Sequence, residues 1–169
     1  MGHPVLRVRA REIDRASLQQ PLMQKFIDDM IDTMHEYHGV GLAAPQVHER
    51  LRIFVAAINP GDAEPLPPDS EPMIFVNPVI TPVGQETFED WEGCLSIPDL
   101  RGQVPRARDI KVTALDRNGE KIEFSTRDFP ARVIQHETDH LDGILFLDRM
   151  KSFGTLSFLD EYQRYWTKD

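Results

Sequence analysis

The chain has 169 residues, of which 40% are hydrophobic and 28% are charged, and this composition is typical of one globular domain with a sizeable core. Its 28 Asp and Glu outnumber its 19 Lys and Arg, giving a formal net charge of −9, which argues against direct binding to nucleic acid or to anionic membranes. No apolar run reaches the roughly 18 residues that a membrane-spanning helix needs, and the first residues lack a signal-peptide pattern. We therefore expect a single domain over residues 1–169, a cytoplasmic location, and small or peptidic partners.

The first predicted element is a helix over residues 17–37. Apolar side chains recur there at steps of three and four residues, which is typical of a helix with one buried stripe. The stripe consists of Leu22, Met23, Phe26, Ile27, Met30, Ile31 and Met34. The glycines and the proline of GVGLAAPQ, residues 39–46, end the helix.

Short strands are predicted next. Residues 51–58 (LRIFVAAI) and residues 73–80 (MIFVNPVI) are apolar runs of strand length. Between them, residues 59–72 are rich in proline and acidic side chains and have no periodicity, so we expect a surface loop and not a linker between domains. This loop either shapes the edge of the cleft or, as we favour, only decorates the surface.

A β-hairpin is predicted over residues 109–125. DIKVTAL and KIEFS have strand character and flank DRNGE. Asn118 and Gly119 are expected to supply the positive φ angles that a tight hairpin turn requires.

The second predicted helix lies within residues 128–146. Asp128 is expected to cap its N-terminus and Gly143 to close its C-terminus. A short terminal helix is expected within residues 154–169. Because helices and strands do not alternate regularly, we predict an α+β fold in which antiparallel sheets pack around the second helix.

The motif QHETDH, residues 135–140, is the strongest chemical signal. His136 and His140 stand four residues apart on the second predicted helix, so both project from one face about 6 Å apart along the axis. Glu137 lies about 100° around the helix from His136. The pattern H-E-x-x-H indicates two metal ligands and a general base, whereas its alternative is a polar helix face that carries two histidines by chance.

A catalytic metal site usually has three protein ligands, so a third one is needed. After His140 the chain contains no histidine, and Glu161, near the C-terminus, is its only later glutamate. Cys94 is the single cysteine of the chain, and it is an inert core thiol, a nucleophile or a soft ligand for a transition metal. Its occurrence together with QHETDH favours the metal ligand.

Three motifs in this order resemble the peptide deformylase family. They are GVGLAAPQ at 39–46, EGCLS at 92–96 and QHETDH at 135–140, and the resemblance covers most of residues 20–150. It implies a hydrolase that removes the formyl group from the N-terminal formyl-methionine of newly synthesised polypeptides.

The resemblance also implies the catalytic groups. The metal would be held by Cys94, His136 and His140, with water in the fourth position. Glu137 would take a proton from that water and return it to the leaving amine. The side-chain amide of Gln46 and the backbone N–H of Leu95 would donate to the oxyanion.

Substrate contacts are implied as well. The family holds its peptide through groups that correspond to Val40, Gly41, Gly93 and Arg101. Phe129 and Val133 could line an apolar pocket for methionine, although both also suit an ordinary core. Glu92 and Arg106 match a carboxylate and an arginine that pair beside the site in relatives.

The metal and the partners follow from the same resemblance. One divalent cation is expected, with Fe²⁺ as the native ion and Zn²⁺, Ni²⁺ or Co²⁺ able to substitute, although a cysteine–histidine site suits zinc on general grounds. The substrates would be N-formylmethionyl peptides of nascent chains, with transient ribosome contact. The tail, residues 157–169, is mixed in charge, which does not favour docking through a basic helix.

Two rival functions are weaker. A general metallopeptidase would lack its usual third ligand and would leave the glycine and cysteine motifs unexplained. A non-enzymatic binding module of the same fold would be expected to lose Glu137, Gln46 or a metal ligand, and all of them are present.

Overall fold

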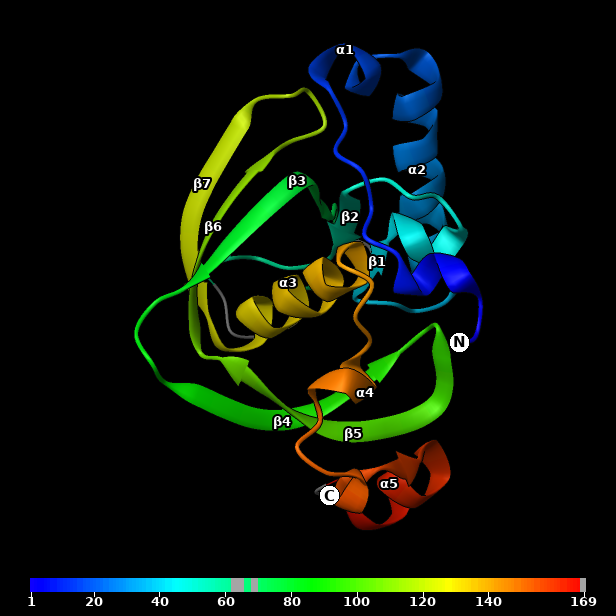
Figure 1. Cartoon of the computed structure of the whole chain (residues 1–169), viewed down its shortest axis with the longest axis vertical. Helices are drawn as coiled ribbons and strands as arrows, with labels where there is room; N and C mark the ends of the chain where they lie inside the picture. Colours follow the sequence, from blue (N-terminus) through cyan, green and yellow to red (C-terminus); the bar gives the residue numbers. More distant parts are fainter. Residues whose placement is uncertain (62–65, 68–69, 168–169) are drawn as a thin grey trace.

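The computed structural model describes residues 1–61, 66–67 and 70–167 (Figure 1). Its α-helices are α1 (Arg15–Leu18), α2 (Pro21–Glu36), α3 (Asp128–Leu141), α4 (Phe146–Arg149) and α5 (Leu159–Tyr165), and its 3-10 turns are η1 (Pro4–Arg7), η2 (Ala44–Val47) and η3 (Phe153–Thr155). Its strands are β1 (Gly41–Ala43), β2 (Ile53–Ala56), β3 (Met73–Pro82), β4 (Thr87–Cys94), β5 (Ile97–Ala107), β6 (Asp109–Leu115), β7 (Lys121–Arg127) and β8 (Ser157–Phe158). Within these described residues, no helix has the length and apolar character needed to cross a membrane.

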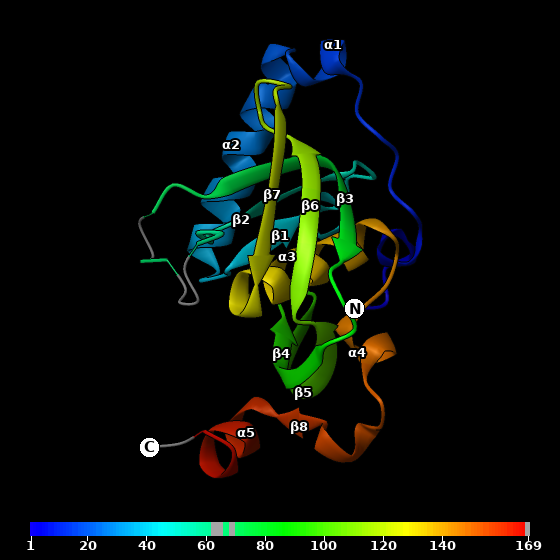
Figure 2. The same ribbon diagram turned by 90° about the vertical axis from the view of Figure 1, so that its left-hand side faces the viewer.

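The strands form two antiparallel sheets, as the predicted α+β fold requires. The larger sheet has the order β1-β2-β3-β6-β7 and the smaller one the order β4-β5-β8. Helix α3 lies between them and contacts strands of both (Figure 1). Figure 2 shows β3, β6 and β7 side by side, with α5 beyond β4 and β5. The helix that bears H-E-x-x-H is therefore central.

Alternating side chains of β2 explain why a helix covers each face of the larger sheet. Ile53 and Val55 point to one side, where they join the apolar cluster that contains the buried side of α2. Phe54 points to the other side and packs in the cluster that contains Ala131 and Ile134 of α3. Both faces of the sheet are thus buried at β2, and the apolar side of α3 packs against one of them.

The single helix predicted over residues 17–37 is divided in two by Pro21. Gln20, the residue before the proline, is extended (φ −68°, ψ 140°), as proline disfavours a helical conformation at that position. The prediction was also wrong for Leu22, which is 83% exposed. The buried stripe of α2 consists of Ile27, Met30 and Met34.

The predicted strands and hairpin are confirmed as β2, β3, β6 and β7. In the turn, Gly119 has the expected positive φ of 79°, but Asn118 has not. The carboxylate of Asp116 accepts the backbone N–H groups of Asn118 and Glu120, both at 2.8 Å, so one left-handed residue is enough to close the turn.

Two segments between the first helix and β3 differ in outcome. No strand was predicted within GVGLAAPQ, but its residues 41–43 form β1, an edge strand paired with β2. The predicted loop over residues 59–72 falls partly outside the described residues, at 62–65 and 68–69, and its described parts contain no helix or strand.

The N-terminal end of α3 differs from the prediction, whereas its C-terminal end agrees with it. Asp128 does not cap the helix: it is the first helical residue, with a φ of 55°, and the N-cap position is Arg127. Its carboxylate instead forms an ion pair with Arg108 at 2.7 Å. Gly143 follows the helix with a φ of 75°, as expected for a C-terminal glycine.

Candidate active site

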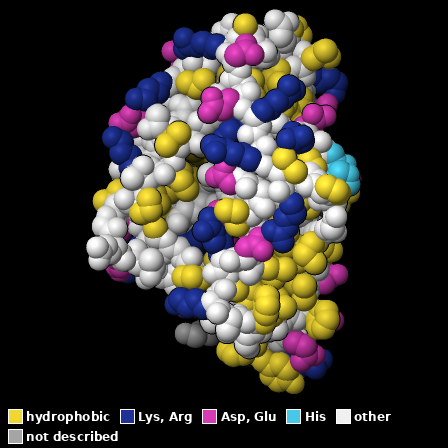
Figure 3. Space-filling model, in the orientation of Figure 1, with side chains coloured by type: hydrophobic (Ala, Val, Ile, Leu, Met, Phe, Trp, Pro, Cys, Tyr) yellow, Lys and Arg dark blue, Asp and Glu magenta, His cyan; other side chains and the backbone are white. Residues whose placement is uncertain are grey.

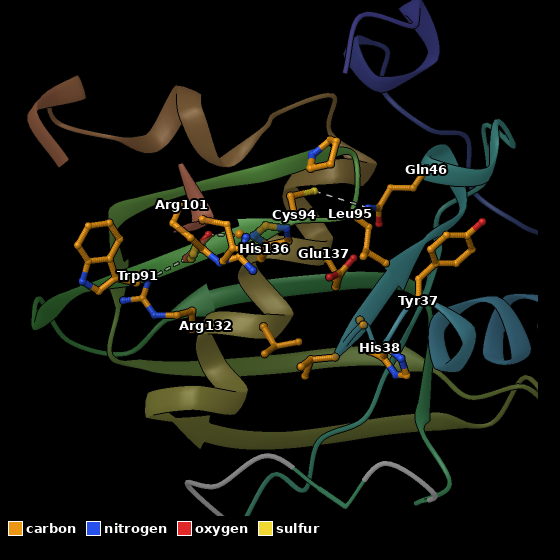
Figure 4. A pocket seen from close by; sticks show the side chains of 18 of the residues that line it. Tyr37, His38, Gln46, Trp91, Cys94, Leu95, Arg101, Arg132, His136 and Glu137 are labelled. Carbon is orange, nitrogen blue, oxygen red and sulfur yellow. Dashed lines mark hydrogen bonds and ion pairs between the residues drawn. The ribbon is translucent and has the colours of Figure 1, made fainter. Parts of the chain in front are cut away.

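Helix α3 and strand β4 bring three potential metal ligands together, and Figure 4 shows two of them, Cys94 and His136. His136 and His140 lie on one side of α3, and Cys94 is the last residue of β4. One donor atom from each of these residues lies within 4.8 Å of the others. The Cys94 Sγ is 3.2 Å from Nε2 of His140, so the sequence-predicted triad is brought together in space.

The chemistry of this donor set fits a transition-metal cation. Nδ1 of His136 contacts the Glu92 carboxylate at 2.9 Å, which leaves its Nε2 for a metal. Although burial acts to lower it, hydrogen bonds to Cys94 and Glu92 raise the pKa of His136 to about 10. Burial lowers the pKa of His140, which keeps that imidazole in its neutral, ligand form. One thiol and two imidazoles are donor groups that suit a divalent transition metal, so the residues present fit such an ion.

A buried carboxylate, Glu92, anchors the site. It accepts two hydrogen bonds from Arg106, at 2.9 and 3.0 Å, and one from Arg132 at 2.7 Å. Burial acts to raise its pKa, but the hydrogen bonds from His136 and Arg106 hold that pKa well below its usual range. The expected pairing of Glu92 with Arg106 is thus confirmed, and a third cationic group joins it.

Three further members of this network, Arg132, Asp139 and Arg149, were missed from the sequence. Arg106 also bonds to Asp139, whose carboxylate pairs with Arg149. Arg132 and Asp139 lie on α3 four residues before and three residues after His136, so they share its side of the helix. That spacing indicates that both charges face the metal site, but it does not identify the groups that neutralise them.

Glu137 lies buried next to β1. Its side chain is confined there, with a residue exposure of 4%, and burial raises its pKa to about 7. The Glu137 side chain fits there only because residue 41 is a glycine. A Cβ atom on Gly41 would lie 2.5 Å from Oε1 and 2.8 Å from Cγ of Glu137, which is too close for contact. A carboxyl group whose pKa lies near neutrality can both accept and return a proton.

The amide of Gln46 points its N–H groups at the site. Its Oε1 accepts the backbone N–H of Ala43 at 2.8 Å, which fixes the orientation of the amide. Its Nε2 then lies 3.2 Å from Oγ of Ser96 and 3.6 Å from Sγ of Cys94. Leu95 follows Cys94 at the end of β4 and lines the same cavity.

A cavity of about 650 Å³ opens beside these groups. The edge strand β1 contributes to its lining on one side, and β4, β5 and α3 contribute on the others. Its lining includes every residue predicted to bind substrate, namely Val40, Gly41, Gly93, Arg101, Phe129 and Val133. Trp91, Arg132 and Leu159 also line it and were not predicted. His140 is only 1% exposed, behind this lining.

Comparison of the sequence with known protein families identifies the family to which the chain belongs. The sequence profile described as polypeptide deformylase matches residues 1–155. The chain belongs to the polypeptide deformylase family. It is therefore a hydrolase that removes the N-terminal formyl group from nascent polypeptides, and metal dependence is a general property of its family.

Individual relatives agree over almost the full length. The chain is 41% identical to peptide deformylase 2 of Nostoc sp., over all of its own residues and 93% of that protein. The Met-Ala-Ser-bound class I type b peptide deformylase of Acinetobacter baumannii is 40% identical, with a TM-score of 0.79 over 89% of this chain and 94% of that one. The Thermotoga maritima peptide deformylase is 39% identical, with a TM-score of 0.78 over 90% and 95%.

Proposed function

We propose that deformylation takes place at Cys94, His136 and His140, which hold one divalent metal ion, beside the carboxylate of Glu137. The observation that carries this proposal is the approach of the three donor atoms to within 4.8 Å of one another, next to a buried carboxylate. When bound, the metal acts as a Lewis acid that activates water for hydrolysis.

Glu137 is the proposed general base and acid. It takes a proton from the attacking water and returns it to the amine that leaves. A pKa near 7 suits both steps at neutral pH. The buried position against Gly41 keeps the carboxylate aimed at the cavity instead of at solvent.

Gln46 and Leu95 are the proposed donors to the oxyanion that develops on the formyl oxygen. The Gln46 amide is already oriented by Ala43, so little reorganisation is needed when charge develops. Removal of one such donor typically lowers turnover by ~10²–10³. We expect a Gln46→Ala variant to show a loss of that size in kcat, and its metal content to stay unchanged.

The substrate peptide is proposed to lie along the edge strand β1. Gly41 begins this strand and Val40 precedes it, and among the described residues β1 has a strand partner, β2, on one side only, which leaves the other side for an added strand. Gly93 and Arg101 line the opposite side, and Phe129 and Val133 form the methionine pocket. The related enzyme whose structure contains Met-Ala-Ser supports binding of an N-terminal peptide by this chain.

Fe²⁺ is the proposed native metal, with Zn²⁺, Ni²⁺ or Co²⁺ able to replace it. Ferrous iron beside a thiolate is sensitive to oxygen, so the iron form should lose activity in air while a nickel-loaded form keeps it. Metal analysis and activity assays over the same exposure time check this. Equal decay of the two forms would contradict the assignment of iron.

We also propose the cellular setting and the extent of the catalytic unit. The whole of residues 1–169 is taken as one catalytic domain that acts in the cytoplasm on nascent chains. Its contact with the ribosome would be transient. Helix α5 contains Asp160, Glu161 and Arg164 and is not a basic helix, so any such contact would rely on other surfaces.

The proposed function is tested with peptides. Protein purified without oxygen should release formate from formyl-Met-Ala-Ser and should leave unformylated Met-Ala-Ser and casein intact. Cleavage of casein without formate release would support a general metallopeptidase instead. Binding of the peptide without any turnover would support a non-enzymatic module.

A further inference from the structure

The C-terminal segment, residues 157–166, takes part in the cavity although it lies beyond the residues 1–155 that the family profile matches. Its strand β8 pairs with β5, where Ser157 lies opposite Arg101. Leu159, the first residue of α5, lines the cavity. Figures 1 and 2 both place this segment directly beyond β4 and β5.

Three aromatic rings connect α5 to the cavity wall. Trp91 of β4 lines the cavity, and its ring centroid is 4.8 Å from that of Tyr162 and 5.3 Å from that of Trp166. We call Trp91, Tyr162 and Trp166 the aromatic clamp. Hydrophobic side chains gather on the surface around α5 (Figure 3). The position of the Trp91 ring is thus set by residues that do not themselves line the cavity.

The two sides of β4 have different surroundings. Glu92 and Cys94 point toward α3, where they contact His136 and His140. Trp91 points the other way, toward α5, and the guanidinium of Arg101 occupies the space beside Gly93 that a Cβ would fill. This alternation is the normal consequence of a strand backbone. The cavity therefore has one wall on α3 and another at Trp91, Leu159 and Arg101.

An extended peptide alternates in the same way. If its methionine enters the pocket of Phe129 and Val133 on α3, the side chain of the next residue points away from α3. Trp91 precedes Cys94 by three strand residues, roughly 10 Å along β4, which is too far for contact with the formyl group. The second residue of the peptide is the part of the substrate that faces this wall.

We propose that Trp91 and Leu159, held in place by α5, form a subsite that favours a bulky apolar side chain at the second residue of the formyl-methionyl peptide. The subsite deepens the proposed deformylase function and rests on it. Because it contacts the substrate away from the reacting bond, it stabilises substrate and transition state alike. A bulky apolar second residue should therefore lower KM and leave kcat nearly unchanged.

The first test compares formyl-Met-Leu-Ser with formyl-Met-Gly-Ser. The native chain should have a KM about fivefold to tenfold lower for the leucine peptide, with kcat values within about twofold. Tyr162→Ala, which releases the Trp91 ring, should reduce that preference to less than about twofold. Tyr165→Ala is the matched control, because Tyr165 lies on the same helix, is 68% exposed and should leave the preference intact.

Two kinetic results would overturn the subsite. One is the absence of a leucine preference in the native chain, and the other is an undiminished preference in Tyr162→Ala. Circular dichroism checks that this variant folds. Should it fail to fold, Leu159→Ala replaces it and should lose the same preference, because it removes the aliphatic half of the wall.

A second test does not depend on turnover. The chain has two tryptophans, and both belong to the aromatic clamp, so Trp166→Phe leaves Trp91 as the sole reporter. Binding of unformylated Met-Leu-Ser should change the fluorescence of Trp91. Met-Gly-Ser should produce the same change only at a higher concentration. Calorimetric binding with equal affinity for both peptides and without a fluorescence change would overturn the subsite. A normal fluorescence response without formate release would count against the proposed function alone.

Discussion

At the scale of single residues, the charges around Glu92 decide whether the site can be built at all. One buried carboxylate faces Arg106, Arg132 and His136, and it connects β4 to β5 and α3. Burying these charges is costly, and the hydrogen bonds and ion pairs among them offset that cost. The network therefore positions Cys94, two residues along the strand, relative to the histidines of α3.

Replacing the carboxylate of Glu92 should destabilise the fold, because the buried arginines then lose the charge that neutralises them. Glu92→Gln leaves Arg106 and Arg132 buried without their shared anion, which should lower the free energy of unfolding by about 3–5 kcal/mol. Urea denaturation measures the change. Glu89→Gln is the control, because Glu89 lies on the same strand and pairs with Lys151 at the surface. Equal effects of the two substitutions would show that the network contributes little.

A second prediction at this scale concerns the effect of a side chain at Gly41 on turnover. A methyl group there would collide with the carboxylate of Glu137, which is buried and cannot turn away freely. Gly41→Ala should therefore lower kcat by about 10²-fold, as expected when a general base is displaced. Gly154→Ala places its methyl at an ordinary distance of 3.4 Å from Ser152 and should leave kcat unchanged. Unaltered turnover in Gly41→Ala would mean that Glu137 has another position open to it.

The residues that could be predicted from the sequence are those whose partners are close along the chain. The spacing of His136 and His140 suffices to place them on one side of a helix. Arg132 could not be interpreted in that way, because its guanidinium is held by Glu92 and the carbonyl of Val104, on strands of the smaller sheet. Only the packing of α3 against that sheet shows why an arginine is buried there.

At the scale of elements, the candidate metal site joins one strand to one helix. Cys94 ends β4, while both histidines belong to α3. These elements come from regions about 40 residues apart, so a ligand set that spans them ties the smaller sheet to the central helix. Metal binding to the folded state alone should stabilise that state by mass action.

This linkage can be measured by thermal unfolding. Adding Ni²⁺ to the metal-depleted chain should raise the Tm, since 100-fold excess over Kd contributes about 2.7 kcal/mol. Cys94→Ser should lose most of that rise. His48→Ala is the control: it removes an exposed histidine outside the site, and its Tm should rise with Ni²⁺ as much as that of the native chain. A rise in Cys94→Ser equal to that of the native chain would exclude Cys94 as a ligand.

Local patterns predicted several elements: periodicity predicted most of α2, strand character around a turn predicted the hairpin β6–β7, and the signals at both ends predicted α3. Periodicity found no other element. It missed β1, because three residues are too few for a pattern and only pairing with β2 makes them a strand. It also missed the long strand β5, whose Pro98 and Pro105 argue against a strand. Strand β5 lies between β4 and β8, and those partners establish it in spite of both prolines.

At the scale of the whole molecule, the site draws on separate parts of the fold. The larger sheet supplies Gly41 on its edge strand, the smaller sheet supplies Cys94 on β4, and α3 supplies Glu137 and both histidines. The C-terminal segment adds Leu159 to the cavity. Because α3 packs against both sheets, its position sets the width of the cavity between them.

The central claim is that Glu137 performs the proton transfers of a metal-dependent deformylation. Formate release from formyl-Met-Ala-Ser, measured without oxygen together with metal content per chain, tests it most directly. Glu137→Ala should lose turnover by at least ~10²-fold while it retains about one metal ion, and Glu161→Ala, on the exposed helix α5, should behave as the native chain. Turnover by Glu137→Ala at the native rate, with its metal in place, would contradict the claim.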